Sequence, residues 1–68
     1  MKKIIGIDPG LTKTGIGIIS VHNNQINFIS SSTIYSKSNW DLADRLSHFY
    51  QELTKILDQY NPDIAAIE

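Results

Sequence analysis

In the stretch Ile4-Ile5-Gly6-Ile7-Asp8-Pro9-Gly10, an apolar run ends at a single carboxylate, which a Pro-Gly turn follows. Its isoleucines lie at both parities, which is typical of a strand buried on both faces. Pro9 removes a ladder donor, and Gly10 permits a close approach that a side chain would forbid. We therefore predict a strand over 2–8 that ends at Asp8, whose charge needs water, a partner or a metal ion.

Length and composition limit the possible classes of protein. The chain has 68 residues, enough for one small domain with a marginal core. It has no cysteine, which excludes disulfides and cysteine-based zinc sites and fits a reducing, cytoplasmic location. No apolar run approaches the ~18 residues of a membrane span, so we expect no membrane partner. The net charge of −1 lacks the basic excess of a typical nucleic-acid binder.

The other elements follow from hydrophobic periodicity and turn signals. Apolar residues at spacings of three and four indicate a helix, and a polar turn between two β-rich runs indicates a hairpin. Ser38 and Asp41 are predicted to form a capping box before the helix, and Pro62 stops the chain after it. We predict strands over 14–21, 26–34 and 63–68 and a helix over 41–60.

This order of elements predicts an α/β architecture. The first three strands form an antiparallel meander, and the helix is a crossover that returns the fourth strand parallel to the first. The helix covers one face of the sheet, and the other face has no partner within the chain. We interpret this as part of a larger domain, the alternative being a face covered by a second copy. Gly15 and Gly17 share one face of the second strand and leave it bare for a neighbouring backbone or a ligand.

Two acids end the two strands that we expect to be parallel neighbours, Asp8 and Glu68. Parallel neighbours lie about 4.8 Å apart, and open α/β sheets place their sites at this carboxyl edge. Paired carboxylates are ligands for hard cations such as magnesium or manganese, which can hold the oxygens of a phosphodiester during hydrolysis. The alternative is that Asp8 is only a turn residue and Glu68 only an exposed chain end.

Four short segments carry a family resemblance: Gly6-Ile7-Asp8-Pro9-Gly10, Thr14-Gly15-Ile16-Gly17, Asn61-Pro62-Asp63 and Ile67-Glu68. Together, and over all 68 residues, they resemble the RuvC family of crossover junction endodeoxyribonucleases. The resemblance implies a partial ribonuclease H-like fold, with 1–68 as the N-terminal segment of a single nuclease domain. It also implies a magnesium-dependent enzyme that resolves Holliday junctions in DNA recombination and repair, with manganese possible in place of magnesium.

The resemblance assigns roles and partners as well. Asp8 and Glu68 match the family's metal-binding catalytic acids, and the partners implied are four-way junction DNA, a second copy in a homodimer and junction branch-migration proteins. The family takes two further acids from a C-terminal helix, and these 68 residues lack that helix. We therefore expect the 68-residue chain to have little or no nuclease activity alone. Lys13, Lys37 and Arg45 are candidate contacts to DNA phosphates, the alternative for each being an idle surface charge.

The sequence is also compatible with other functions. Actin-like and sugar-kinase ATPases also begin with a strand, an Ile-Asp-x-Gly turn and a hairpin that cradles phosphate, where Gly10 and Thr12 could act. Those proteins usually place Thr or Ser directly after the glycine, and this chain has Leu11. A related nuclease acting on other nucleic acids, and a non-catalytic module that self-associates through its uncovered face, are the remaining alternatives.

Overall fold

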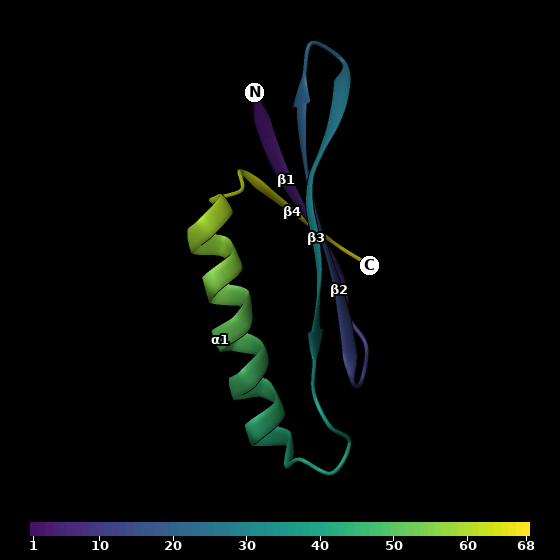
Figure 1. Ribbon diagram of the computed structural model, residues 1–68, viewed down its shortest axis with the longest axis vertical. Coiled ribbons are helices and arrows are strands. Elements are labelled where there is room, and N and C mark those ends of the chain that lie inside the picture. The colour runs from purple at the N-terminus through teal and green to yellow at the C-terminus, as the bar shows by residue number, and fades with distance from the viewer.

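The computed structural model describes all 68 residues and shows a sheet with one helix beside it (Figure 1). The predicted bounds differ from the observed ones by no more than a single residue at any end. The elements are β1 Lys2–Asp8, β2 Lys13–His22, β3 Gln25–Tyr35, α1 Leu42–Tyr60 and β4 Ile64–Ile67.

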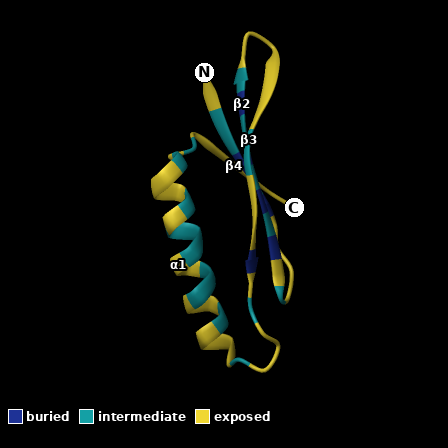
Figure 2. Ribbon diagram, viewed as in Figure 1, coloured by how far each residue is buried: buried dark blue, intermediate teal, exposed yellow.

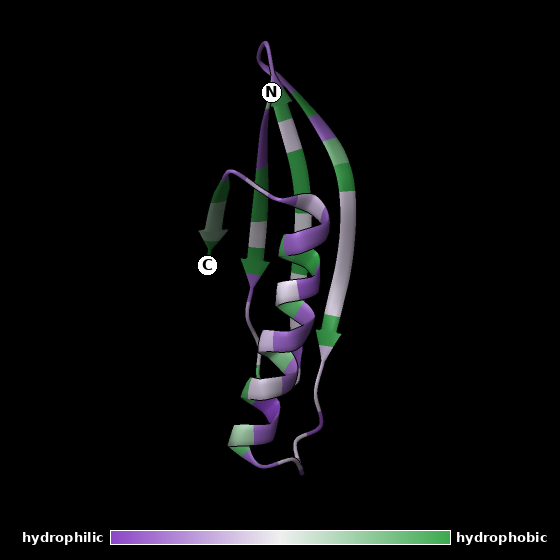
Figure 3. Ribbon diagram, turned by 90° about the vertical axis from the view of Figure 1, so that its left-hand side faces the viewer, coloured by the Kyte–Doolittle hydropathy of each residue, from purple (hydrophilic) through white to green (hydrophobic).

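The sheet has the order β3-β2-β1-β4. β2 pairs antiparallel with both β1 and β3, and β4 pairs parallel with β1, which confirms the predicted meander and crossover. The β2–β3 hairpin turns through Asn23 and Asn24, whose φ angles are 50° and 65°. Asparagine tolerates this left-handed backbone, which matches the twist of the strands in a two-residue hairpin. Figure 3 shows β4 at one edge of the sheet, to one side of α1, which lies in front of the other strands.

The core lies between the sheet and α1 and consists of isoleucines from the first three strands. Its members are Ile5, Ile7, Ile16, Ile18 and Ile34. From α1, four partly buried residues pack against them: Phe49, Leu53, Ile56 and Tyr60. No residue of α1 is fully buried (Figure 2), and Leu46 on its apolar side is 59% exposed. The helix therefore covers its face of the sheet only in part.

The predicted capping box at the start of α1 is wrong. Asp41, not Ser38, occupies the N-cap, and its side chain makes no capping hydrogen bond. Ser38 lies in a turn that the Trp40 amide closes by donating to the Lys37 carbonyl at 3.1 Å, outside the first helical turn. The helix start is held instead by Arg45, whose Nε donates to the Trp40 carbonyl at 3.2 Å.

The helix is not long and apolar enough to cross a membrane.

Because the core is small, the loss of one core side chain is expected to have a large effect on stability. Ile18 is only 1% exposed, so Ile18→Ala is expected to lower the free energy of unfolding by about 2–5 kcal/mol, because it leaves a cavity among the other isoleucines. Ile67→Ala is the matched control, since Ile67 is 69% exposed. Urea denaturation followed by circular dichroism measures both. Equal losses for the two variants would contradict the assigned core.

Candidate active site

Asp8 lies on the face of the sheet that α1 does not cover. Side chains alternate along a strand, and Ile5 and Ile7 of β1 enter the core, so Gly6 and Asp8 point to the opposite face. On β2, Gly15 is the partner of Asp8, and a Cβ built on Gly15 would lie 3.8 Å from the Asp8 Cβ. The carboxylate of Asp8 therefore stands beside bare backbone, exposed to solvent.

Glu68 continues the register of β4 and lies next to Asp8. Ile67 pairs with Ile7, and the Glu68 amide donates to the Ile7 carbonyl at 3.2 Å. The parallel register places Glu68 opposite Asp8, on the same face of the sheet. The structure thus brings together the two acids that the sequence singled out, at the carboxyl ends of adjacent strands.

The two acids border a hollow of about 490 Å³ whose floor is made of very small residues. Its small members are Gly6, Gly15, Gly17 and Ala66. No glycine of the chain has a positive φ, and nothing lies within 4 Å of a Cβ built on Gly17. Neither backbone conformation nor packing inside the chain therefore requires a glycine at Gly17. Its bareness keeps space open beside the carboxylates.

The donor set of this hollow fits a hard divalent cation. Both candidate ligands are carboxylates, the type that Mg²⁺ binds together with several retained waters. The chain's one ion pair joins Lys55 to Glu52 on α1, so no lysine or arginine of the chain forms a salt bridge with Asp8 or Glu68. No group of three or more His, Cys, Asp or Glu side chains gathers anywhere in the 68 residues. The 68 residues therefore bring two carboxylates together at this place.

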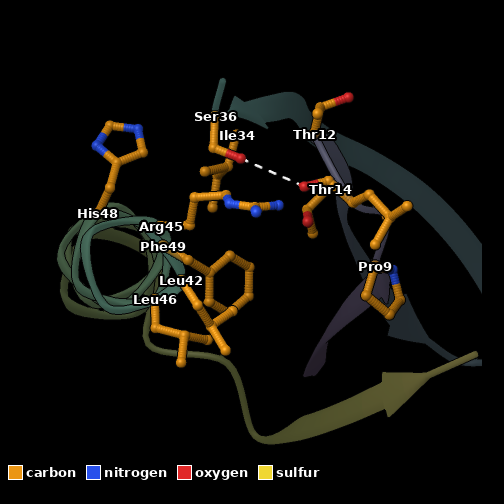
Figure 4. A pocket seen from close by; sticks show the side chains of 12 residues that line it. Pro9, Thr12, Thr14, Ile34, Ser36, Leu42, Arg45, Leu46, His48 and Phe49 are labelled. Carbon is orange, nitrogen blue, oxygen red and sulfur yellow. Dashed lines mark hydrogen bonds between the residues drawn. The ribbon is translucent and has the colours of Figure 1, made fainter. Parts of the chain in front are cut away.

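The loop that follows Asp8 is tightly held. A Cβ on Gly10 would overlap the carbonyl oxygen of Lys13, so the turn needs glycine for close approach. The Ser36 amide donates to the Thr12 carbonyl at 2.9 Å, and the Ser36 hydroxyl donates to the Leu11 carbonyl at 3.4 Å (Figure 4). Two hydrogen bonds thus tie the loop to Ser36, the residue that follows β3.

The three basic candidates lie near this loop but not on one face. Lys13 starts β2 and alternates with the buried residue Thr14, which places Lys13 on the face of Asp8. Lys37 is exposed in the turn before α1. Arg45 is half-buried and reaches into a separate cavity of about 260 Å³ between α1 and the loop (Figure 4). Arg45 therefore lies on the helix side of the sheet, away from the two carboxylates.

Sequence reasoning missed the contacts that hold the start of β4. The Lys3 amide donates to Asp63 Oδ2 at 2.9 Å, and the Asp63 amide donates to the Lys3 carbonyl at 2.9 Å. The Lys3 ammonium donates to the Tyr60 carbonyl at 3.1 Å. Asn61-Pro62-Asp63 signals only a helix stop in the sequence. Nothing in the spacing points to a partner sixty residues away.

Comparison with known proteins identifies the family. The family model of the crossover junction endodeoxyribonuclease RuvC matches residues 4–68. The chain belongs to the RuvC family. RuvC proteins of Rhizobium johnstonii and Bartonella henselae are 46% and 47% identical to it over 66 residues. Each match covers 97% of this chain, and the chain spans only 39% of the length of either relative.

Solved structures show the same fold. Thermus thermophilus RuvC matches with a TM-score of 0.85 at 19% identity, over 96% of this chain and 43% of that one. The same protein in complex with a Holliday junction substrate matches with a TM-score of 0.88. A PPX-GPPA enzyme of Aquifex aeolicus matches with a TM-score of 0.70 at 14% identity, over 97% of this chain and 25% of that one. These matches confirm the ribonuclease H-like fold.

Two glycines beside the site are expected to respond differently to the same change. Gly10→Ala is expected to lower stability by about 1–3 kcal/mol, because its Cβ meets the Lys13 carbonyl and the loop must shift. Gly17→Ala is expected to leave stability unchanged or raise it by up to about 1 kcal/mol, since its Cβ enters open space. Thermal unfolding of both variants measures the difference. A larger loss for Gly17→Ala would contradict the open hollow.

Proposed function

We propose that this chain is the N-terminal segment of a RuvC nuclease domain, and that the complete enzyme resolves Holliday junctions by magnesium-dependent phosphodiester hydrolysis. The observation that carries the proposal is the Asp8–Glu68 pair at adjacent parallel strand ends, beside an uncovered glycine floor. Membership of the RuvC family supports the same chemistry. It also favours a nuclease over an ATPase.

In this proposal Asp8 and Glu68 hold Mg²⁺, and Mn²⁺ can replace it. The ion, when bound, polarises the scissile phosphate and offsets the negative charge that develops there. The residues of this chain do the positioning: β1 and β4 set the separation of the two carboxylates, and Gly17 leaves room for a sugar-phosphate backbone to approach them. Two carboxylates bind Mg²⁺ weakly, so we propose that the rest of the domain supplies the remaining ligands.

The proposed substrate is four-way junction DNA, because a Thermus thermophilus RuvC of the same fold is seen with a Holliday junction. Lys13, on the face of Asp8, is the best placed of the three basic residues to contact a phosphate beside the site. Lys37 and Arg45 would contact the strand only further from the cleavage point. We further propose that the enzyme is a homodimer that works with branch-migration proteins in the cytoplasm.

Replacing either carboxylate tests the proposed metal site. In the full-length protein, Asp8→Asn and Glu68→Gln are each expected to reduce junction cleavage by about a hundredfold or more, because each removes a charged ligand while keeping the side-chain volume. The reaction is followed in Mg²⁺ with labelled four-way junctions. Asp58→Asn is the control, since Asp58 is an exposed helix residue away from the hollow. Normal cleavage by Asp8→Asn would overturn the assignment.

The proposed phosphate contact of Lys13 has its own signature. Lys13→Ala is expected to weaken junction binding at low salt and to reduce the slope of log affinity against log salt by about 1, as for the loss of one phosphate contact. Lys55→Ala serves as the control, because Lys55 lies on α1 and pairs with Glu52. Binding is measured by fluorescence anisotropy with a catalytically silent background variant. An unchanged slope for Lys13→Ala would mark it as an idle surface charge.

A further inference from the structure

We propose that Asp63 is a positioning residue that sets the register of β4 and thereby places Glu68 beside Asp8. The inference rests on the proposed function of the Asp8–Glu68 pair. It concerns a residue outside the hollow, five positions before Glu68 in the chain. Asp63 therefore acts through Glu68 and touches neither metal nor DNA.

The register of β4 against β1 decides where Glu68 lies. β4 pairs in parallel with β1 from Ile64 to Ile67, and Glu68 follows directly. A slip of one residue would turn Glu68 to the opposite face. A slip of two would move it about 6.6 Å along the strand.

The contacts between Lys3 and Asp63 form a closed pair at the start of β4. The Lys3 amide donates to Asp63 Oδ2 and the Asp63 amide donates to the Lys3 carbonyl, both at 2.9 Å. The Asp63 carboxylate takes the place of a backbone carbonyl in the ladder. Two residues earlier, Asn61 ends α1 in the left-handed conformation. A slipped strand would lose both hydrogen bonds.

The same lysine ties this pair to the end of α1. The Lys3 ammonium donates to the Tyr60 carbonyl at 3.1 Å, and α1 has no basic residue of its own in its last turn. A cation at a helix C-terminus is stabilised by the helix dipole. Lys3 thus fixes the end of the crossover helix with its side chain and the start of β4 with its backbone. Both ends of the short segment 61–63 are held.

The contacts at the other end of β4 are weaker. There the Glu68 amide donates to the Ile7 carbonyl at 3.2 Å, and the Glu68 side chain takes part in no hydrogen bond or salt bridge within the chain. The Lys3–Asp63 pair therefore fixes the register at the start of β4, and the backbone pairing of β4 with β1 carries that register on to Glu68. Without the Asp63 carboxylate, the Lys3 amide would lose this acceptor, and fewer contacts would fix the start of β4 against β1.

The test uses three variants of the full-length enzyme. Asp63→Ala removes the acceptor, Asp63→Asn keeps an oxygen acceptor without the charge, and Asp58→Ala removes an exposed acid nearby without any such contact. Mn²⁺ binding is measured by electron paramagnetic resonance. Hydrogen exchange of the Glu68 amide is measured without metal, and kcat and KM for junction cleavage are measured separately.

Asp63→Ala is expected to weaken Mn²⁺ binding about tenfold and to lower kcat more than it raises KM, because it displaces a ligand. Hydrogen exchange at the Glu68 amide is expected to speed up roughly tenfold or more. Asp63→Asn is expected to restore all three close to wild-type values, and Asp58→Ala to change none. Wild-type behaviour of Asp63→Ala would overturn the proposal. So would failure of Asp63→Asn to restore, or an equal effect of Asp58→Ala.

The same measurements separate this inference from the proposed function. If the wild-type enzyme neither binds Mn²⁺ nor cleaves junctions, the proposed function fails. The exchange rate of the Glu68 amide still shows whether Asp63 holds the register of β4. If wild-type binding and cleavage are normal and Asp63→Ala matches them with an unchanged exchange rate, only the positioning role fails.

Discussion

The parallel pairing of β1 with β4 is the constraint on which the rest of this structure depends. β1 lies between β2 and β4, and its alternating side chains serve two purposes: Ile5 and Ile7 build the core, while Asp8 reaches the opposite face. The hairpin covers one edge of β1, and α1 carries the chain back to its other edge. Only this return in parallel brings Glu68 to the same end of the sheet as Asp8.

The elements could be predicted from the sequence because local patterns encode them strongly. β-Branched runs, a polar turn and an apolar helical stripe each require only neighbouring residues to be recognised. The capping box failed because its spacing matched while the path of the chain did not: the turn at Lys37–Trp40 delays the helix until Leu42. Local spacing fixes which residues could cap a helix, and the approach from β3 decides which residue does.

Some features of the candidate site can likewise be predicted from the sequence, and others cannot. The pairing of Asp8 with Glu68 follows from strand parity and a parallel crossover, both of which are visible in the sequence. The side of the sheet on which Arg45 lies, and the partnership of Lys3 with Asp63, depend on three-dimensional proximity alone. The sequence alone therefore does not show which face of the sheet a basic residue on the crossover helix reaches. An aspartate after a helix stop gives no hint of a partner at the other end of the chain.

The exposure of the two carboxylates connects the open face with the proposed binding of a cation. Asp8 is exposed to water on this face, as is Glu68, and neither forms a salt bridge within the chain. Covering the face, with the rest of a domain or with DNA, would remove that water and leave two like charges side by side at a cost of several kcal/mol each. A divalent cation relieves this cost, so closure of the face and cation binding are expected to favour one another.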